Sequence, residues 1–74
     1  MADVQTGVAV EVNGKAEPVA AETVAALLAE KGLDPSGRGI AVAVNGAVVP
    51  RARWAQTPVR AGDAVEIVQA KQGG

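Results

Sequence analysis

Alternating valines predict a β-strand from Val8 to Val12, in which every second side chain is a valine. A period of two places one side of a strand against a core. The Asn13-Gly14 pair that follows is typical of a tight hairpin turn, because both central positions need a positive φ that these residues tolerate best. We therefore expect Lys15 to Val19 to return as a short peripheral strand, with Pro18 toward an exposed edge.

A helical period replaces the strand period in the next segment. Apolar residues at positions i, i+3 and i+4, counted from Val24, share one face of a helix. Thr23 is a suitable N-cap, while Gly32 followed by Leu33 can close the other end through a left-handed glycine. The pattern predicts one helix from Thr23 to Lys31.

The second half of the chain begins with a loop over 34–39 that contains a proline and two glycines. Ile40 to Val44 is apolar at every position, which predicts a central strand covered by the helix on one face. Asn45-Gly46 predicts a second hairpin turn. Val48-Val49 can then pair back as a short strand, which Pro50 ends because proline has no N–H to donate.

A last strand is predicted from Ala64 to Val68, with Val65 and Ile67 on one face, whereas the preceding stretch 51–56 predicts no element. One helix on a mixed sheet of four to five strands is the simplest architecture that buries both apolar faces. We therefore predict an α+β fold of the β-grasp type, with the first and last strands parallel at the centre. Residues 1–74 are expected to form a single domain, in which 1–7 is a polar, disordered extension.

Composition narrows the chemistry that this domain can perform. The chain has no Cys and no His, which removes disulfides, thiolate nucleophiles and the usual general base at neutral pH. A net charge of -1 provides no basic field for nucleic acid. No apolar run approaches the roughly 20 residues that span a bilayer, and the N-terminus lacks a signal-peptide pattern. We expect a cytoplasmic protein that is not an enzyme, binds no metal or cofactor itself, and has neither nucleic acid nor a membrane as partner.

The end of the chain carries the candidate chemistry. Residues 70–74 follow the last strand and end in Gly73-Gly74, which predicts a flexible tail with an unrestricted backbone. An enzyme that draws a chain terminus into a narrow channel needs a segment without side chains. The Gly74 carboxylate is an unreactive anion at neutral pH, so it must be activated, for example by adenylyl transfer from ATP. A sulfur donor could then convert it to a thiocarboxylate.

Several short motifs together resemble the ThiS family, the sulfur carriers of thiamine biosynthesis, in identity and spacing. They are Val44-Asn45-Gly46, Val49-Pro50-Arg51, Trp54-Ala55-Gln56, Val59, Gly62-Asp63 and the terminal Gly73-Gly74. The resemblance implies that Gly74 carries the sulfur as a thiocarboxylate for thiazole synthesis and that Gly73 gives access to it. It also implies three partners: a ThiF-type adenylating enzyme that uses ATP and magnesium, a thiazole synthase, and a sulfur donor protein.

Candidate partner contacts lie both in the tail and in the body of the domain. Lys71 and Gln72 precede the diglycine, and Arg51 follows the predicted short strand. Trp54, the only tryptophan and the only aromatic residue, favours a packing role over a partner contact. The apolar sheet surface is a further candidate docking patch, around Ala41, Ala43 and Val65 or its neighbours, and the sequence leaves open which side of the sheet is exposed.

Other classes of protein fit the same sequence. A sulfur carrier of another pathway, such as the small subunit of molybdopterin synthase, would share the tail and its activation. A ubiquitin-like protein modifier would instead join Gly74 to a lysine of a target protein. A β-grasp interaction module, in which the diglycine is incidental, would function without its tail.

Overall fold

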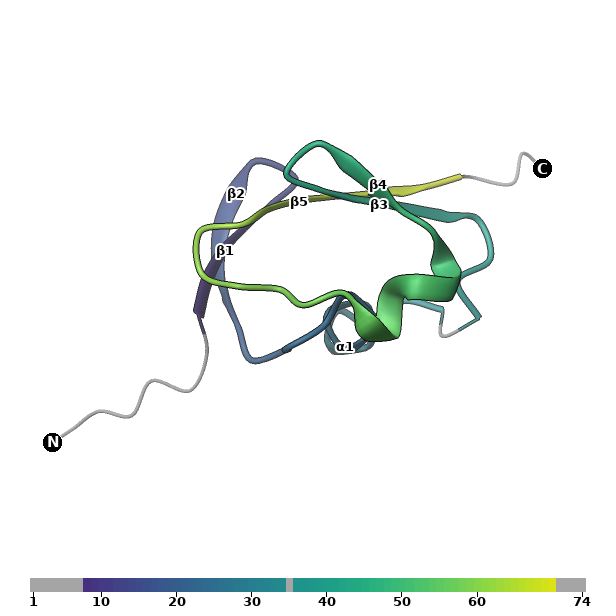
Figure 1. Cartoon of the computed structure of the whole chain (residues 1–74), viewed down its shortest axis with the longest axis horizontal. Coiled ribbons are helices and arrows are strands. Elements are labelled where there is room, and N and C mark those ends of the chain that lie inside the picture. Colours follow the sequence, from purple (N-terminus) through teal and green to yellow (C-terminus); the bar gives the residue numbers. More distant parts are fainter. Residues whose placement is uncertain (1–7, 35, 71–74) are drawn as a thin grey trace, which may run out of the picture.

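Five strands and two helical segments make up the described part of the protein. The computed structural model describes residues 8–34 and 36–70. The elements follow the order β1 (Val8–Val12), β2 (Lys15–Val19), α1 (Val24–Glu30), β3 (Ile40–Val44), β4 (Ala47–Val49), the 3-10 helix η1 (Arg51–Gln56) and β5 (Ala64–Gln69). The sheet forms one layer, and α1 and η1 lie on the same side of it (Figure 1). The predicted α+β class is confirmed.

The sheet has the strand order β2-β1-β5-β3-β4. Strands β1 and β5 are parallel, with Glu11 opposite Ala64 and Val12 opposite Val65, while the other neighbouring pairs are antiparallel. The prediction of parallel first and last strands in the middle of the sheet is therefore confirmed. Pro18 lies on the edge strand β2, where its missing N–H costs no interior hydrogen bond.

Both predicted Asn-Gly turns are present with the expected backbone. Asn13 and Gly14 have φ of 52° and 83°, and Asn45 and Gly46 have φ of 51° and 85°. Two consecutive positive φ values give the turn a twist that matches the twist of the flanking strands. These turns fix the register of the hairpins β1–β2 and β3–β4.

Helix α1 is bounded by the two caps that the sequence predicts. The Oγ1 of Thr23 accepts a hydrogen bond from the N–H of Ala26 at 3.1 Å. At the other end Gly32 has φ of 76°, and the Leu33 N–H donates to the Leu28 carbonyl at 3.0 Å. This pattern satisfies the last carbonyls of the helix. Thr23 and Lys31 are the caps and the helix itself is Val24–Glu30, one residue shorter at each end than predicted.

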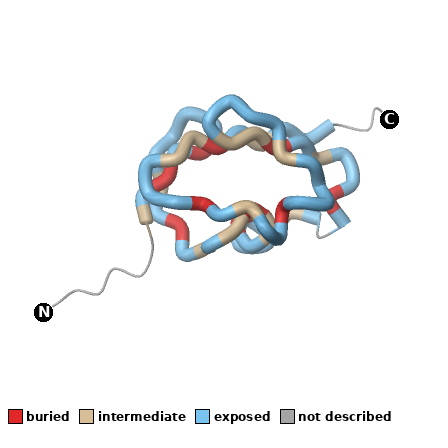
Figure 2. Tube along the Cα trace, viewed as in Figure 1, coloured by how far each residue is buried: buried red, intermediate tan, exposed pale blue. Residues whose placement is uncertain are grey.

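The core fills the space between the sheet and the two helical segments. Figure 2 shows that the buried positions occur in both layers, in the strands of the sheet and along the helical side. Leu27 and Val24 are completely buried, and all the buried residues are apolar. The core residues of the described part are Val10, Val12, Val19, Val24, Leu27, Leu28, Val42, Trp54, Val59 and Val65.

Segment η1 is the element that the sequence did not predict. Its residues Arg51–Gln56 show no apolar period, and the segment contacts α1 through the buried Trp54. The Trp54 Nε1–H donates to the Val49 carbonyl at 2.9 Å, so the one polar atom of the indole is satisfied inside the core. Trp54 is therefore a packing residue, as predicted.

Gly37 and Gly14 form a matched pair for testing the Trp54 packing. Both have positive φ, but a Cβ on Gly37 would lie 2.6 Å from the Trp54 ring and 2.7 Å from Arg51 Cδ, whereas a Cβ on Gly14 would meet nothing within 4 Å. We expect Gly14→Ala to lower the unfolding free energy by about 1 kcal/mol and Gly37→Ala by about 2–4 kcal/mol. Urea unfolding measures both values. Equal losses would contradict the close approach at Gly37.

Candidate functional site

The candidate site is the end of β5 from which the C-terminal residues continue. Strand β5 extends through Gln69, one residue beyond the predicted end at Val68, because Gln69 pairs with Ile40. The Ala70 N–H then donates to the Gly39 carbonyl at 2.7 Å. Ala70 is thus held at the edge of the domain and marks the position from which the last four residues begin.

The residues predicted to carry the chemistry lie outside the described part of the chain. These are Gly73 and Gly74, together with the candidate contacts Lys71 and Gln72. Four residues beyond Ala70 can reach about 13–14 Å when extended. Their roles therefore stay predictions, while the structure defines where this segment is anchored.

Arg51 lies in η1 and contacts the loop that precedes β3. Its Nη1 donates to the Ser36 carbonyl at 2.9 Å. Its aliphatic part lies against Gly37, next to the Trp54 ring. The Arg51 side chain is exposed, and its hydrogen bond to Ser36 fixes its orientation. The predicted partner would therefore contact a side chain that is already ordered.

The open face of the sheet carries the two large exposed apolar side chains of the described residues. Val48 is 77% exposed and Val68 is 62% exposed. They surround a shallow hollow of about 180 Å³ with Ala41, Ala43 and Glu66. This face is opposite the core, since the neighbouring residues on the same strands are the buried ones.

Of the residues that the prediction left open, Val65 does not belong to this open face. Val65 is 1% exposed and lies in the core. Side chains alternate along a strand, so Val65 and Ile67 face the helix whereas Glu66 and Val68 face outward. The exposed valine of β5 is therefore Val68.

Two acidic side chains of the domain, Asp63 and Asp34, have structural partners. Asp63 accepts from the Arg60 N–H at 2.8 Å and from Asn45 Nδ2 at 3.1 Å, so it stabilises the turn before β5. The pKa of Asp34 is held below its ordinary value, first by the hydrogen bond from the Ser36 backbone N–H. Residues 8–34 and 36–70 contain no group of three or more His, Cys, Asp or Glu residues arranged to hold a metal ion.

The fold and the position of its C-terminal strand define a ubiquitin-like β-grasp protein. The ThiS family model matches residues 6–74. A crystal structure of the thiamine biosynthesis protein (ThiS) from Geobacter metallireducens is similar, with 34% sequence identity and a TM-score of 0.74. The match covers 90% of this chain and 100% of that one. The chain belongs to the ThiS family, whose members are small sulfur carriers.

One further comparison and one property of the helices complete the description. The search of curated proteins gave no match. Among the helices of the described residues, none combines the length and the apolar character needed to cross a membrane.

Proposed function

We propose that this protein carries sulfur for thiazole synthesis in thiamine biosynthesis, as a thiocarboxylate on Gly74. The observation that carries the proposal is a ThiS-family β-grasp domain whose sequence continues beyond its central strand to a terminal diglycine. The chain contributes the terminal carboxyl group. ATP and magnesium belong to the adenylating partner, so the carrier is a cosubstrate.

The first chemical step activates a poor electrophile. A carboxylate oxygen of Gly74 attacks the α-phosphorus of ATP, pyrophosphate leaves, and a mixed anhydride with AMP forms. The terminal sulfur of a persulfide on the donor then attacks the carbonyl carbon and AMP leaves, which gives an acyl disulfide. A second thiol of the donor system attacks the sulfur–sulfur bond. This releases the thiocarboxylate and leaves a disulfide on the donor.

The terminal glycines suit this chemistry for a steric reason. A chain end inside an active-site channel must adopt whatever backbone conformation aligns its carboxylate with ATP, and glycine has the widest choice. We expect Gly74→Ala to lower the rate of thiocarboxylate formation by about tenfold to a hundredfold, because a 1 Å misplacement of reacting groups has effects of that size. Single-turnover mass spectrometry measures the rate. A wild-type rate would argue against a side-chain-excluding channel.

The open face of the sheet is the proposed contact surface for the adenylating partner. Val68 lies on β5, the strand that leads to the tail, so a protein that holds this face also positions the start of the tail. We expect Val68→Asp to raise the KM for the carrier at least about tenfold, because a charge would be buried next to Glu66 against an apolar partner surface.

Ala16→Asp is the matched control for that substitution. Ala16 is exposed on the edge strand β2, and β2 and β5 are separated in the sheet by β1. Both variants introduce the same charge on an exposed strand position. If the two raise KM equally, the hollow around Val68 is not the contact surface.

Intact-mass analysis tests the proposed function. The chain is incubated with ATP, magnesium, a persulfide donor and the host's ThiF-type adenylating enzyme. The expected product has one oxygen replaced by sulfur. A chain found instead on larger proteins through isopeptide bonds would identify a protein modifier, and loading by an adenylating enzyme of molybdopterin synthesis alone would identify a carrier of that pathway.

A further inference from the structure

Strand β5 is paired along its whole length on only one side. On the β3 side its pairing runs from Val65, opposite Val44, to Gln69, opposite Ile40. On the β1 side only Ala64 and Val65 are paired with strand residues. The last part of β5 therefore projects beyond the end of β1 while it remains fixed to β3.

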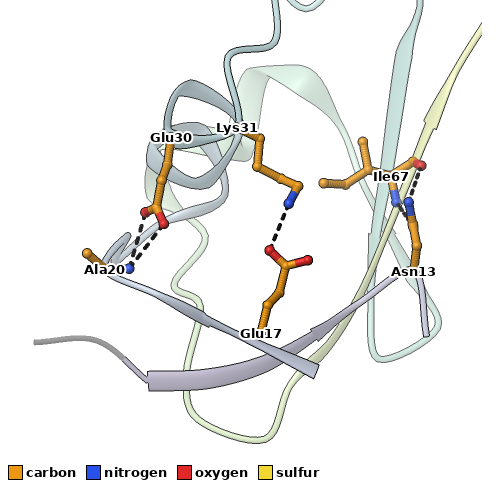
Figure 3. A network of polar contacts seen from close by, with 6 residues as sticks. All are labelled: Asn13, Glu17, Ala20, Glu30, Lys31 and Ile67. Atoms are coloured by element: carbon orange, nitrogen blue, oxygen red, sulfur yellow. Dashed lines mark hydrogen bonds and ion pairs between the residues drawn. The ribbon is translucent and has the colours of Figure 1, made fainter. Parts of the chain in front are cut away.

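The side chain of Asn13 continues the pairing for one more step. The Asn13 N–H donates to the Val65 carbonyl at 2.9 Å. The chain then turns away, and the Asn13 amide group takes the place of a peptide: Oδ1 accepts from the Ile67 N–H at 2.8 Å and Nδ2 donates to the Ile67 carbonyl at 3.2 Å (Figure 3). Both backbone groups of Ile67 are thereby satisfied.

The next backbone groups on that side belong to Gln69. Peptide groups of alternate residues point toward the same side of a strand. Because Val65 and Ile67 bond toward Asn13, the N–H and C=O of Gln69 also point to this side. Among the described residues none pairs with them there. An unpaired N–H and C=O at the end of a rigid strand form a template for another extended chain.

A groove lies directly beside this open edge. It has a volume of about 270 Å³ and is lined by Asn13, Lys31, Leu33, Ile67 and Gln69. Leu33 and Ile67 are half-buried and provide an apolar wall. Lys31 Nζ is paired with Glu17 Oε1 at 2.8 Å, so the charge at the rim is balanced (Figure 3). The groove suits an uncharged, apolar side chain.

We infer that an extended segment of the adenylating partner pairs with the Gln69 backbone and places an apolar side chain in this groove. The inference rests on the proposed function. Gly74 is five residues beyond Gln69, about 17 Å when extended, so a protein that pairs at Gln69 holds the anchor of the segment that it must activate. Strand addition of this kind gives affinity through main-chain hydrogen bonds and specificity through the side-chain groove.

The variants Gln69→Pro and Gln69→Ala distinguish the contribution of the Gln69 backbone N–H to partner binding from that of its side chain. Proline removes the N–H that points to the open edge, and it removes no hydrogen bond to β3, because the Ile40–Gln69 pair is a non-hydrogen-bonded position of that ladder. Alanine removes the side chain and keeps the N–H. We expect Gln69→Pro to raise the KM for adenylation by about tenfold or more, and Gln69→Ala to change it less than about twofold.

Amide hydrogen exchange on the wild-type chain gives a second test that needs no variant. We expect exchange of the Gln69 N–H to slow at least about tenfold when the adenylating partner is added. Equal KM values for the two variants, or unchanged exchange at Gln69 in a complex that loads sulfur, would overturn strand pairing. Protection that depends on carrier concentration without the partner would identify a second copy as the occupant and overturn it too. A wild-type chain that is never adenylated contradicts the proposed function itself.

Discussion

Removal of Gly73 and Gly74 is expected to abolish thiocarboxylate formation, with a loss of at least about a thousandfold in the loading rate. Without them the chain ends at Gln72, two residues short, and an extended chain loses about 7 Å of reach. The new carboxylate would carry a glutamine side chain into a channel that excludes side chains. Mass spectrometry after incubation with ATP, sulfur donor and adenylating enzyme measures the loss.

The unfolding free energy of the truncated chain serves as the control for this deletion. All ten core residues of the described part lie between Val10 and Val65, so the deletion leaves each of these residues in place. We expect the unfolding free energy to change by less than about 0.5 kcal/mol. A truncated chain that still supports thiazole synthesis would show that the diglycine is incidental and that the domain acts through its surface alone.

Trp54→Ala is expected to remove a large part of the stability of the domain. Truncation of a buried aromatic ring costs about 3–5 kcal/mol, and a domain of 74 residues has about 4–11 kcal/mol in total. The substitution also leaves the Val49 carbonyl without the indole N–H. The remaining core consists of Val and Leu side chains that cannot close a cavity of this size. Urea unfolding followed by far-UV circular dichroism measures the loss.

Trp54→Phe distinguishes the contribution of the buried ring from that of the hydrogen bond to Val49. Phenylalanine keeps much of the ring volume but removes the Nε1–H that donates to Val49. We expect a loss of about 1–3 kcal/mol, smaller than that of alanine. If Trp54→Ala costs less than 1 kcal/mol, η1 does not pack on α1 as described here.

The strands, the helix and its caps could be predicted because their signals are local. Period-two valines, two Asn-Gly pairs and a Thr cap each act within a few residues, and the structure confirms them. The parallel pairing of β1 and β5 joins distant segments. It nevertheless followed from the element order, because one sheet covered by one helix leaves few alternatives.

Segment η1 and the end of β5 could not be predicted from such signals. The 3-10 helix at Arg51–Gln56 depends on a tertiary contact, the packing of Trp54 against α1, and the sequence has no periodic pattern there. Gln69 is polar and gives no strand signal, yet its backbone pairs with Ile40. The pairing with β3 therefore extends β5 to Gln69, although the side-chain pattern alone predicts that the strand ends at Val68.

The surroundings of the tail were the least predictable part of the candidate site. Asn13 is a turn residue in the sequence, and only the fold brings its side chain to Ile67, 54 positions away. The sequence also did not determine which residues of β5 lie on the outward face of the sheet. Whether Val65 or Val68 is exposed depends on strand phase, which the helix packing sets through Val65.

Alkylation of the loaded chain tests the central claim most directly. The protein has no cysteine, so a thiol-alkylating reagent finds a thiolate or thiocarboxylate on this chain only if loading has created one, and the Met1 thioether is distinguished by its position in the fragment spectrum. We predict one added alkyl group per chain, located by fragment mass spectrometry on Gly74, and none when ATP is omitted. An unalkylated chain, or an alkyl group on any other residue, would contradict sulfur transfer to the terminal carboxylate.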